Sequence, residues 1–454
     1  MTDRKPTRHS GVSRRDVIRG IGIAGGVALA GGLPSSIAGA RVAAQGEATL
    51  TVWDNWTRDV DSKVIDTLDG EFEKAHAGVK VDRLAKSFDD LKATAKLSLS
   101  SSDGPDLAQI NQGLSDMGAM VKAGVLHDLG PYAKKYGWLE KLSPGIVARN
   151  SFTADGATFG EGNLYGLPVT AEIVGVFYNR EKLAGIGASV PKTFAELEAM
   201  LDKLKAAGEI PLARGNLEGT AAIHAYSEIE NLYVDQTYLD NFVYGRNNVS
   251  FATPENEKAA AKLKEWVDKD YFTPDFSGIG YDDSVQAFKD GQGALMLTGS
   301  WISGLLSADG GAEAFGFFLT PPETAGAPKL SVGGTSMAYA IRDDSEDADV
   351  AAAYADQMLS KRATELWMGA QLVPIQVDPA GVKQGTLYAD LVTAWNHLNE
   401  TNTVGHYIDW ATPTFYDTIT AALQELMAGQ VKPDAFVKEV QADYGAYLSK
   451  KGGA

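Results

Sequence analysis

The fold is decided by the stretch TLTVWDNWTRDVDSKVIDTLDGEFEKAHAGVKV, residues 49–81. Residues 49–53 combine β-branched and apolar side chains, which is typical of a strand. Apolar residues then recur at helical spacing between positions 60 and 75, and residues 79–81 begin a second strand. This strand–helix–strand order predicts a parallel α/β sheet, and we expect the same alternation to continue along the chain.

Three later segments carry local signals. We expect a buried strand at 173–178, a helix that Thr193 caps with Glu196 three residues later, and a linker or hinge in the Pro-rich segment 320–328.

Residues 1–40 have the features of an export signal. Arg14 and Arg15 precede a Gly- and Ala-rich apolar stretch at 20–33, and small residues follow it. An apolar stretch this short does not span a bilayer comfortably, and its glycines argue against the alternative of an uncleaved anchor helix. We therefore expect cleavage within residues 40–45 and export by the twin-arginine pathway to the periplasm or the cell exterior.

The composition excludes several classes of partner. Without residues 1–40, the basic residues fall from 41 to 35 and the acidic residues from 59 to 57, which leaves a net charge of −22. Such a surface repels nucleic acid and anionic membrane faces. The chain has no cysteine, so we expect no thiol-linked lipid anchor on the mature protein.

Five further motifs follow the opening stretch in a fixed order. They are DGPD (103–106), LYGLPV (164–169) with FYNRE (177–181), VPKTFAEL (190–197), FKDGQGALM (288–296) with GSW (299–301), and the segment 423–431. Each motif is weak alone, but together they extend over nearly the whole mature chain. In this order they resemble the extracellular solute-binding proteins of carbohydrate ABC transporters, the maltose-binding-protein superfamily.

The resemblance implies an α/β fold of two lobes joined by a hinge, with the ligand cleft between them. The expected lobe boundaries are 47–171 and 325–368 for the first lobe, and 172–324 and 369–454 for the second. The implied function is the substrate-binding component of an ABC sugar importer. We expect a monomer that binds a carbohydrate, docks on permease subunits, needs no cofactor and is not an enzyme.

Sugar recognition needs two kinds of side chain, and the chain offers both in the loops after its expected strands. Aromatic rings stack on the C–H faces of a sugar, and charged or amide groups bond its hydroxyls, which are costly to bury unpaired. The expected ligand-binding residues are Trp53, Asn55, Trp56, Asn111, Gln112, Glu172, Trp301, Gly333, Gly334, Asp409, Trp410 and Tyr416.

Two of these assignments come from the resemblance, because Trp301 matches a stacking tryptophan of the family and Glu172 matches a ligand-contacting glutamate. Tyr416 and Phe415 lie in the region where the family places another stacking ring, and Trp410 is a competing candidate for that position. Structural roles remain open for the others: the first two tryptophans as core or rim, the amides as turn formers, and the glycine pair as a simple turn. A departure after the first strand, where Arg58 comes later than the family's basic residue, argues against maltose specificity.

Other functions are weighed against this one. A glycoside hydrolase needs two facing carboxylates, for which Glu172 and Asp409 are the candidates, but no local motif supports catalysis. The six histidines are scattered, which favours surface or core roles over metal ligation. A binding protein for a polyamine or a peptide is the nearer rival, since the negative charge suits a polyamine. Aromatic residues in the loops favour a sugar.

Overall fold

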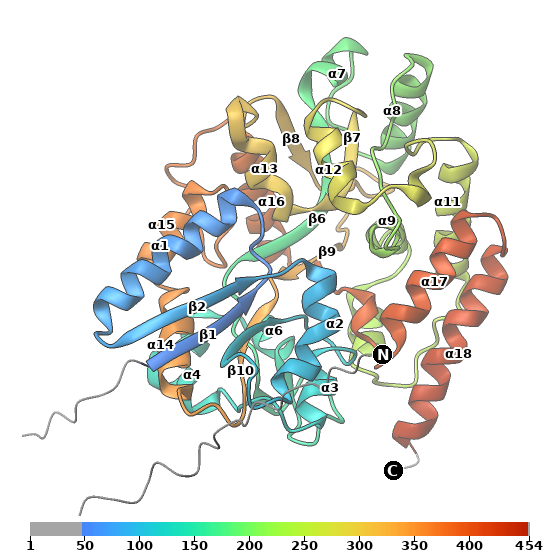
Figure 1. Ribbon diagram of the computed structural model, residues 1–454. Coiled ribbons are helices and arrows are strands. Elements are labelled where there is room, and N and C mark those ends of the chain that lie inside the picture. The colour runs from blue at the N-terminus through green and yellow to red at the C-terminus, as the bar shows by residue number, and fades with distance from the viewer. Residues whose placement is uncertain (1–47, 453–454) are drawn as a thin grey trace, which may run out of the picture. The chain divides into compact units, whose positions relative to one another are not determined.

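A computed structural model describes residues 48–452 (Figure 1). The expected signal peptide, residues 1–40, lies outside the described residues. Within the described part of the chain, no helix is both long enough and apolar enough to cross a membrane.

The first sheet confirms the strand–helix–strand prediction from residues 49–81. Its strands, in spatial order, are β10 (Ala338–Ile341), β3 (Leu107–Ile110), β1 (Ala48–Asp54) and β2 (Val79–Ala85). β1 runs parallel to both β2 and β3, and β10 is antiparallel to β3. The crossovers are α1 (Asp59–Ala75) and α2 (Phe88–Leu99), and α1 buries Ile65, Leu68 and Phe72 in the core below the sheet.

The second sheet is built around β6 (Ala171–Asn179), which confirms the buried strand expected at 173–178. Its path is β11 (Val404–Gly405), β9 (Ser331–Thr335), β6 and β7 (Leu295–Gly299), and β8 (Phe315–Phe318) also pairs with β6. Here the expected parallel alternation is wrong. β7, β8 and β9 all run antiparallel to β6, because the chain enters the sheet along β6 and each of these later strands returns in the opposite direction.

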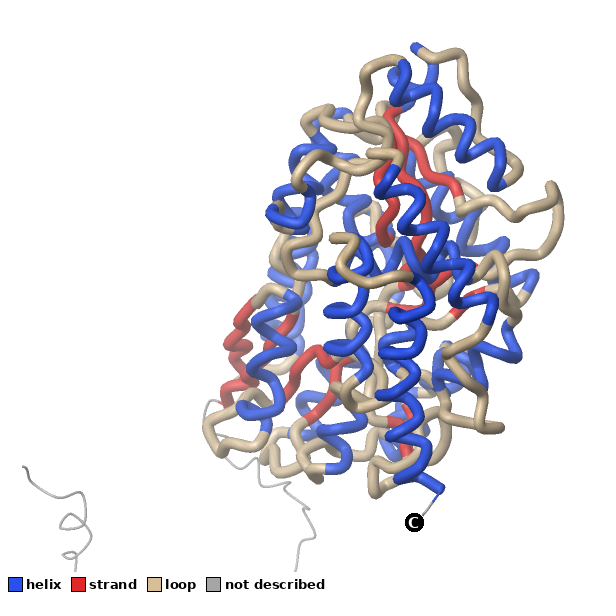
Figure 2. The backbone as a smooth tube through the Cα atoms, turned by 90° about the vertical axis from the view of Figure 1, so that its right-hand side faces the viewer, coloured by secondary structure: helices blue, strands red, loops and turns tan. Residues whose placement is uncertain are grey.

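Helices surround both sheets, and Figure 2 shows the strands gathered in two groups among them. Between the sheets in sequence come α3 (Met117–Lys122), α4 (Gly130–Tyr136), α5 (Trp138–Lys141), α6 (Pro144–Ala148), β4 (Ser151–Phe152) and β5 (Asn163–Leu164). The middle of the chain adds α7 (Arg180–Gly185), α8 (Phe194–Ala206), α9 (Thr220–Glu230), α10 (Gln236–Val243), α11 (Pro254–Asp268), η1 (Phe276–Gly278), α12 (Tyr281–Lys289), η2 (Ser300–Ile302), α13 (Ser303–Ser307) and η3 (Ala308–Gly310). The remaining helices are α14 (Ala348–Gln357), α15 (Lys361–Gly369), α16 (Leu387–Thr401), η4 (Ile408–Trp410), α17 (Phe415–Met427) and α18 (Pro433–Gly452).

Local signals explain where several of these elements begin. Thr193 caps α8 as expected, since its hydroxyl accepts a hydrogen bond from the Glu196 amide at 3.2 Å. The Pro-rich segment 320–328, expected as a linker or hinge, joins β8 to β9 within the second sheet. It is therefore a loop of that sheet and does not connect the two sheets.

Three segments cross between the two sheets and are hydrogen-bonded side by side. The chain passes outward at 167–171 and returns between β9 and β10, where the Leu167 and Tyr339 amides each donate to the other's carbonyl at 2.9 Å. A third crossing follows α15, where the Ala171 amide donates to the carbonyl of Val373 at 2.8 Å. Three chain crossings gathered at one place between two sheets have the geometry of a hinge.

Candidate functional site

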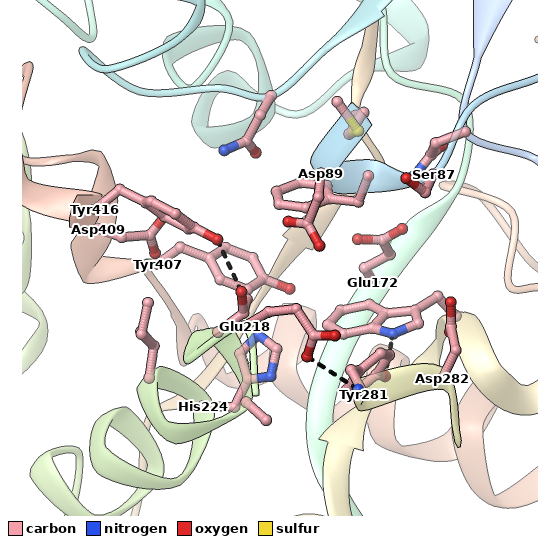
Figure 3. Close-up of a pocket in the computed structure, with 18 of the residues that line it drawn as sticks. Ser87, Asp89, Glu172, Glu218, His224, Tyr281, Asp282, Tyr407, Asp409 and Tyr416 are labelled. Atoms are coloured by element: carbon pink, nitrogen blue, oxygen red, sulfur yellow. Dashed lines mark hydrogen bonds between the residues drawn. The ribbon is translucent and has the colours of Figure 1, made fainter. Parts of the chain in front are cut away.

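A cleft of about 310 Å³ lies where the two sheets face each other beside the crossings (Figure 3). On one side it is lined by loops that follow the first three strands, with Asn55 after β1, Ser87 after β2 and Asn111 after β3. The carboxyl ends of parallel strands lie at one edge of a sheet, so these loops converge on one place. The other side comes from the second sheet and from α9, α12, η4 and α17.

Nine of the twelve residues expected at the binding site line this cleft. They are Asn55, Trp56, Asn111, Gln112, Glu172, Trp301, Asp409, Trp410 and Tyr416. Sequence positions as distant as 55 and 416 are thus brought to one cavity, and contact of these side chains with a ligand stays a prediction.

The other three expected residues do not line the cleft. Trp53 lies on β1, where the ammonium of Lys86 sits 3.7 Å from the centre of its ring, so its indole is engaged elsewhere. The glycine pair serves a buried arginine: the guanidinium of Arg149 donates to the Gly333 carbonyl at 2.5 Å, and a Cβ at Gly334 would lie 2.6 Å from Arg149 Nη1. Gly334 therefore gives room to a side chain of the protein itself, and Gly333 supplies that side chain with an acceptor.

Trp301 forms one wall of the cleft and is held in place by its neighbours. Its indole N–H donates to the Tyr281 hydroxyl at 2.6 Å, and that hydroxyl pairs with Thr298 at 2.8 Å. A Cβ at Gly299 would lie 1.9 Å from the indole, so only glycine leaves room for the ring there. His224 packs against the same indole with ring centres 5.3 Å apart. The ring is thus pre-oriented, which is what a stacking surface requires.

The C-terminal aromatics divide between core and cleft. Trp410 is only 2% exposed and packs edge-on against Phe159, so most of its ring is core. Phe415 is fully buried. Tyr416 is half-buried, its hydroxyl bonds Thr220 at 2.8 Å, and the Lys92 ammonium lies 4.2 Å from the centre of its ring. Among the three candidates for the second stacking position, the exposure favours Tyr416, which has only the ring face away from Lys92 to offer. A further lining ring, Tyr407, was not expected from the sequence.

The polar groups of the cleft are partly committed to the protein and partly free. Gln112 donates to the Ser336 carbonyl at 2.9 Å at the return crossing, and Asn111 donates to Asp116 at 2.9 Å. In contrast, the buried Asn55 Oδ1 and Tyr407 hydroxyl have no partner among residues 48–452. A buried polar atom without a partner is costly, so these two atoms suit the hydroxyls of a bound solute.

Most of the charged side chains that line the cleft are acidic. The six carboxyl groups are those of Asp89, Glu172, Glu218, Asp282, Asp283 and Asp409. Burial raises the pKa of Glu172 to about 8, against an opposing effect of Arg58, and burial raises the pKa of Asp409 to about 6. Both carboxyls therefore favour their protonated forms far more than free side chains do, until a charged or hydrogen-bonding partner enters the cleft.

One ion pair joins the two sides of the cleft. Arg58, which follows β1, contacts the Asp282 carboxylate of α12 at 3.1 Å. The neutral His224 lines the opposite wall, and burial lowers its pKa to about 3. Within residues 48–452, no three His, Asp or Glu side chains are arranged to hold a metal ion.

Several lining residues were missed from the sequence. Ser87 and Asp89 follow β2 directly, so the rule that ligands bind beyond the carboxyl ends of strands could have found them, as it found Asn55. Glu218 precedes α9 and Tyr281 begins α12, and no local pattern marks either position.

Comparisons with known proteins place this geometry in a family. The family model described as bacterial extracellular solute-binding protein matches residues 54–365. The multiple sugar-binding protein of Streptococcus mutans is 24% identical over 369 residues, which is 79% of this chain and 82% of that protein. A further relative is a probable sugar-binding periplasmic protein of Mesorhizobium japonicum, 28% identical over 57% of this chain and 59% of its own length.

Solved structures share the fold. A chitin oligosaccharide binding protein superposes with a TM-score of 0.77 at 21% identity, over 88% of this chain and 99% of that one. The GacH receptor of Streptomyces glaucescens, whose study compares it with maltose-binding protein, gives a TM-score of 0.70 at 20% identity over 89% and 99% of the two chains. The expected two-lobe α/β fold is confirmed.

Proposed function

Because this chain belongs to the bacterial extracellular solute-binding protein family, we propose that it captures a mono- or oligosaccharide in the cleft and delivers it to the permease of an ABC importer. Proteins of this family bind solutes without converting them, so the chain is a receptor and not an enzyme. The relatives named as sugar-binding proteins support a saccharide as the solute.

The observation that carries the proposal is the combination of fixed aromatic rings with unpaired polar atoms in one cleft. The faces of Trp301 and Tyr416 suit the C–H faces of a sugar, and Asn55 Oδ1 and the Tyr407 hydroxyl suit its hydroxyls.

Closure of the lobes is the second part of the proposal. The hydrogen-bonded crossings let the lobes rotate as bodies, and the Arg58–Asp282 pair joins them at the cleft. Ligand contacts made from both sides would favour the closed state over the open one. The proposed lobes are 47–171 with 325–368, and 172–324 with 369–454, although the pairing of β9 with β6 favours a return crossing at residue 336.

The proposed setting is outside the cytoplasmic membrane. The twin-arginine segment at residues 14–15 would export the folded protein, and a chain without cysteine would carry no thiol-linked lipid. There it would act as a monomer that docks on the permease subunits.

The experiment is a thermal-shift screen with neutral mono- to tetrasaccharides, spermidine and short peptides. Since a ligand that binds only the folded chain raises its Tm, at least one saccharide should stabilise the protein. Stabilisation by spermidine or by peptides alone would replace the sugar proposal with its rival. Incubation with the best oligosaccharide should leave it uncleaved, as expected for a receptor.

A further inference from the structure

The charge of the cleft is strongly one-sided. Its lining combines the six carboxyl groups named above with a single guanidinium, that of Arg58. This guanidinium is already paired with Asp282 at 3.1 Å, so it does not neutralise the other five carboxyls. The nearby Lys92 ammonium, which contacts the Tyr416 ring, is already paired with Asp116 at 2.6 Å. Some of these carboxyls can accept hydrogen bonds from sugar hydroxyls, but hydroxyls carry no net charge and leave the negative charge of the cleft uncompensated.

Carboxyls from opposite lobes also face each other across the cleft. Asp89 begins α2 in the first lobe, and Glu218 lies before α9 in the second (Figure 3). Burial, followed by the charges of Glu218 and other acidic neighbours, raises the pKa of Asp89. Closing the lobes therefore brings like charges together, and a cation between them would remove this repulsion.

Asp409 supplies an independent observation deeper in the cleft. Its residue is only 6% exposed, yet its carboxylate lines the cavity and makes no hydrogen bond or ion pair with another side chain of the described range. Glu172 is half-buried at the hinge and is also without such a partner in that range. Both carboxylates lie close enough to act on the Tyr407 hydroxyl, whose pKa is raised by burial and then by their charges.

We propose that the saccharide carries a protonated amine, which donates a hydrogen bond to the Asp409 carboxylate beside the ring of Tyr407, with Glu172 as the second acidic group. This assignment rests on the proposed sugar-binding function and names its substrate class. An ammonium has three donors and no acceptor, so it matches a site of carboxylates and ring faces. The rest of the sugar lies against Trp301, and its hydroxyls bond the polar groups of the cleft described above.

The test uses three β-1,4-linked trisaccharides that differ only at C2: chitosan triose with an ammonium, chitotriose with an N-acetyl group, and cellotriose with a hydroxyl. Calorimetric titration at pH 6, where the sugar amine is largely charged, should give chitosan triose at least a tenfold lower Kd than either neutral analogue. The advantage should shrink severalfold between 0.05 M and 0.5 M NaCl, because salt screens charge pairs.

Two isosteric variants locate the effect. Asp409→Asn should remove most of the tenfold preference, measured as the ratio of the Kd values of the three trisaccharides within that variant, and Glu172→Gln should reduce this ratio in part. Glu400→Gln is the matched control, since it removes one carboxylate from the exposed surface of α16, outside the cleft lining. It should keep the full preference.

The outcomes separate this inference from the function on which it rests. Equal or tighter binding of a neutral trisaccharide overturns the amine assignment while sugar binding stands. Binding of spermidine with no trisaccharide bound overturns both. A preference for chitosan triose that persists in Asp409→Asn also contradicts the assignment, because another group would then hold the amine.

Discussion

Removing the indole of Trp301 should weaken saccharide binding strongly. A tryptophan buries 150–250 Å² in total, so one face offers about 100 Å² to a sugar. At roughly 25 cal/mol per Å² this is worth about 2.5 kcal/mol, which corresponds to roughly a 70-fold rise in Kd for Trp301→Ala. The indole also packs against the core, so the variant should unfold at a lower temperature. Calorimetric titration well below that temperature measures binding alone.

Tyr281→Phe is the control for ring orientation. It keeps the indole but removes the hydroxyl that accepts its N–H at 2.6 Å. The loss of one neutral hydrogen bond costs about 1 kcal/mol, so the Kd should rise only about fivefold. If Trp301→Ala is folded by circular dichroism and binds the preferred saccharide as tightly as the parent protein, the indole is not a stacking surface and the reasoning is refuted.

Three further predictions concern stability, the hinge and export. Burial raises the pKa of Glu230 to about 8, so the folded protein holds this proton more tightly than the unfolded protein. The free energy of unfolding should therefore fall as the pH rises from about 4.5 to 8, by up to about 5 kcal/mol. In urea unfolding curves Glu230→Gln should flatten this pH dependence, and an unchanged pH dependence would argue against a buried protonated Glu230. Arg149→Met should cost about 3 kcal/mol of unfolding free energy, because it leaves the carbonyls of Gly333 and Gly405 without their hydrogen bonds. A urea unfolding midpoint equal to that of the parent protein would show that the guanidinium is dispensable. Replacing Arg14 and Arg15 together by Lys should leave precursor in the cytoplasm, as immunoblots of cell fractions can show, and normal processing would exclude the twin-arginine route.

The fold could be predicted wherever the signal is local. Periodicity within 49–81 gave two strands and the helix between them, since each depends on neighbouring residues. The strand at β6 was also identified, but the direction of its partners was not. Its partners β7, β8 and β9 lie more than a hundred residues later in the chain. The sequence of a strand does not reveal which neighbour it will pair with or in which direction.

The candidate site shows the same division. Asn55 and Asn111 were found because they follow strands of one parallel sheet, whose carboxyl ends converge. Trp53 was misplaced because the sequence does not show which ring near a strand end turns inward. The glycine pair was misplaced because the buried Arg149, which bonds the Gly333 carbonyl and needs the space at Gly334, comes from a segment far away in sequence.

The most direct test of the central claim is a distance measurement between the two lobes with and without saccharide. The chain contains no cysteine, so Leu97→Cys on α2 and Val190→Cys before α8, both on exposed positions, can carry a pair of spin labels. Double electron–electron resonance should show that the preferred saccharide shortens the mean distance between the labels and narrows its distribution, because binding closes the lobes over the cleft. An unchanged distance at saturating saccharide would contradict capture between the lobes.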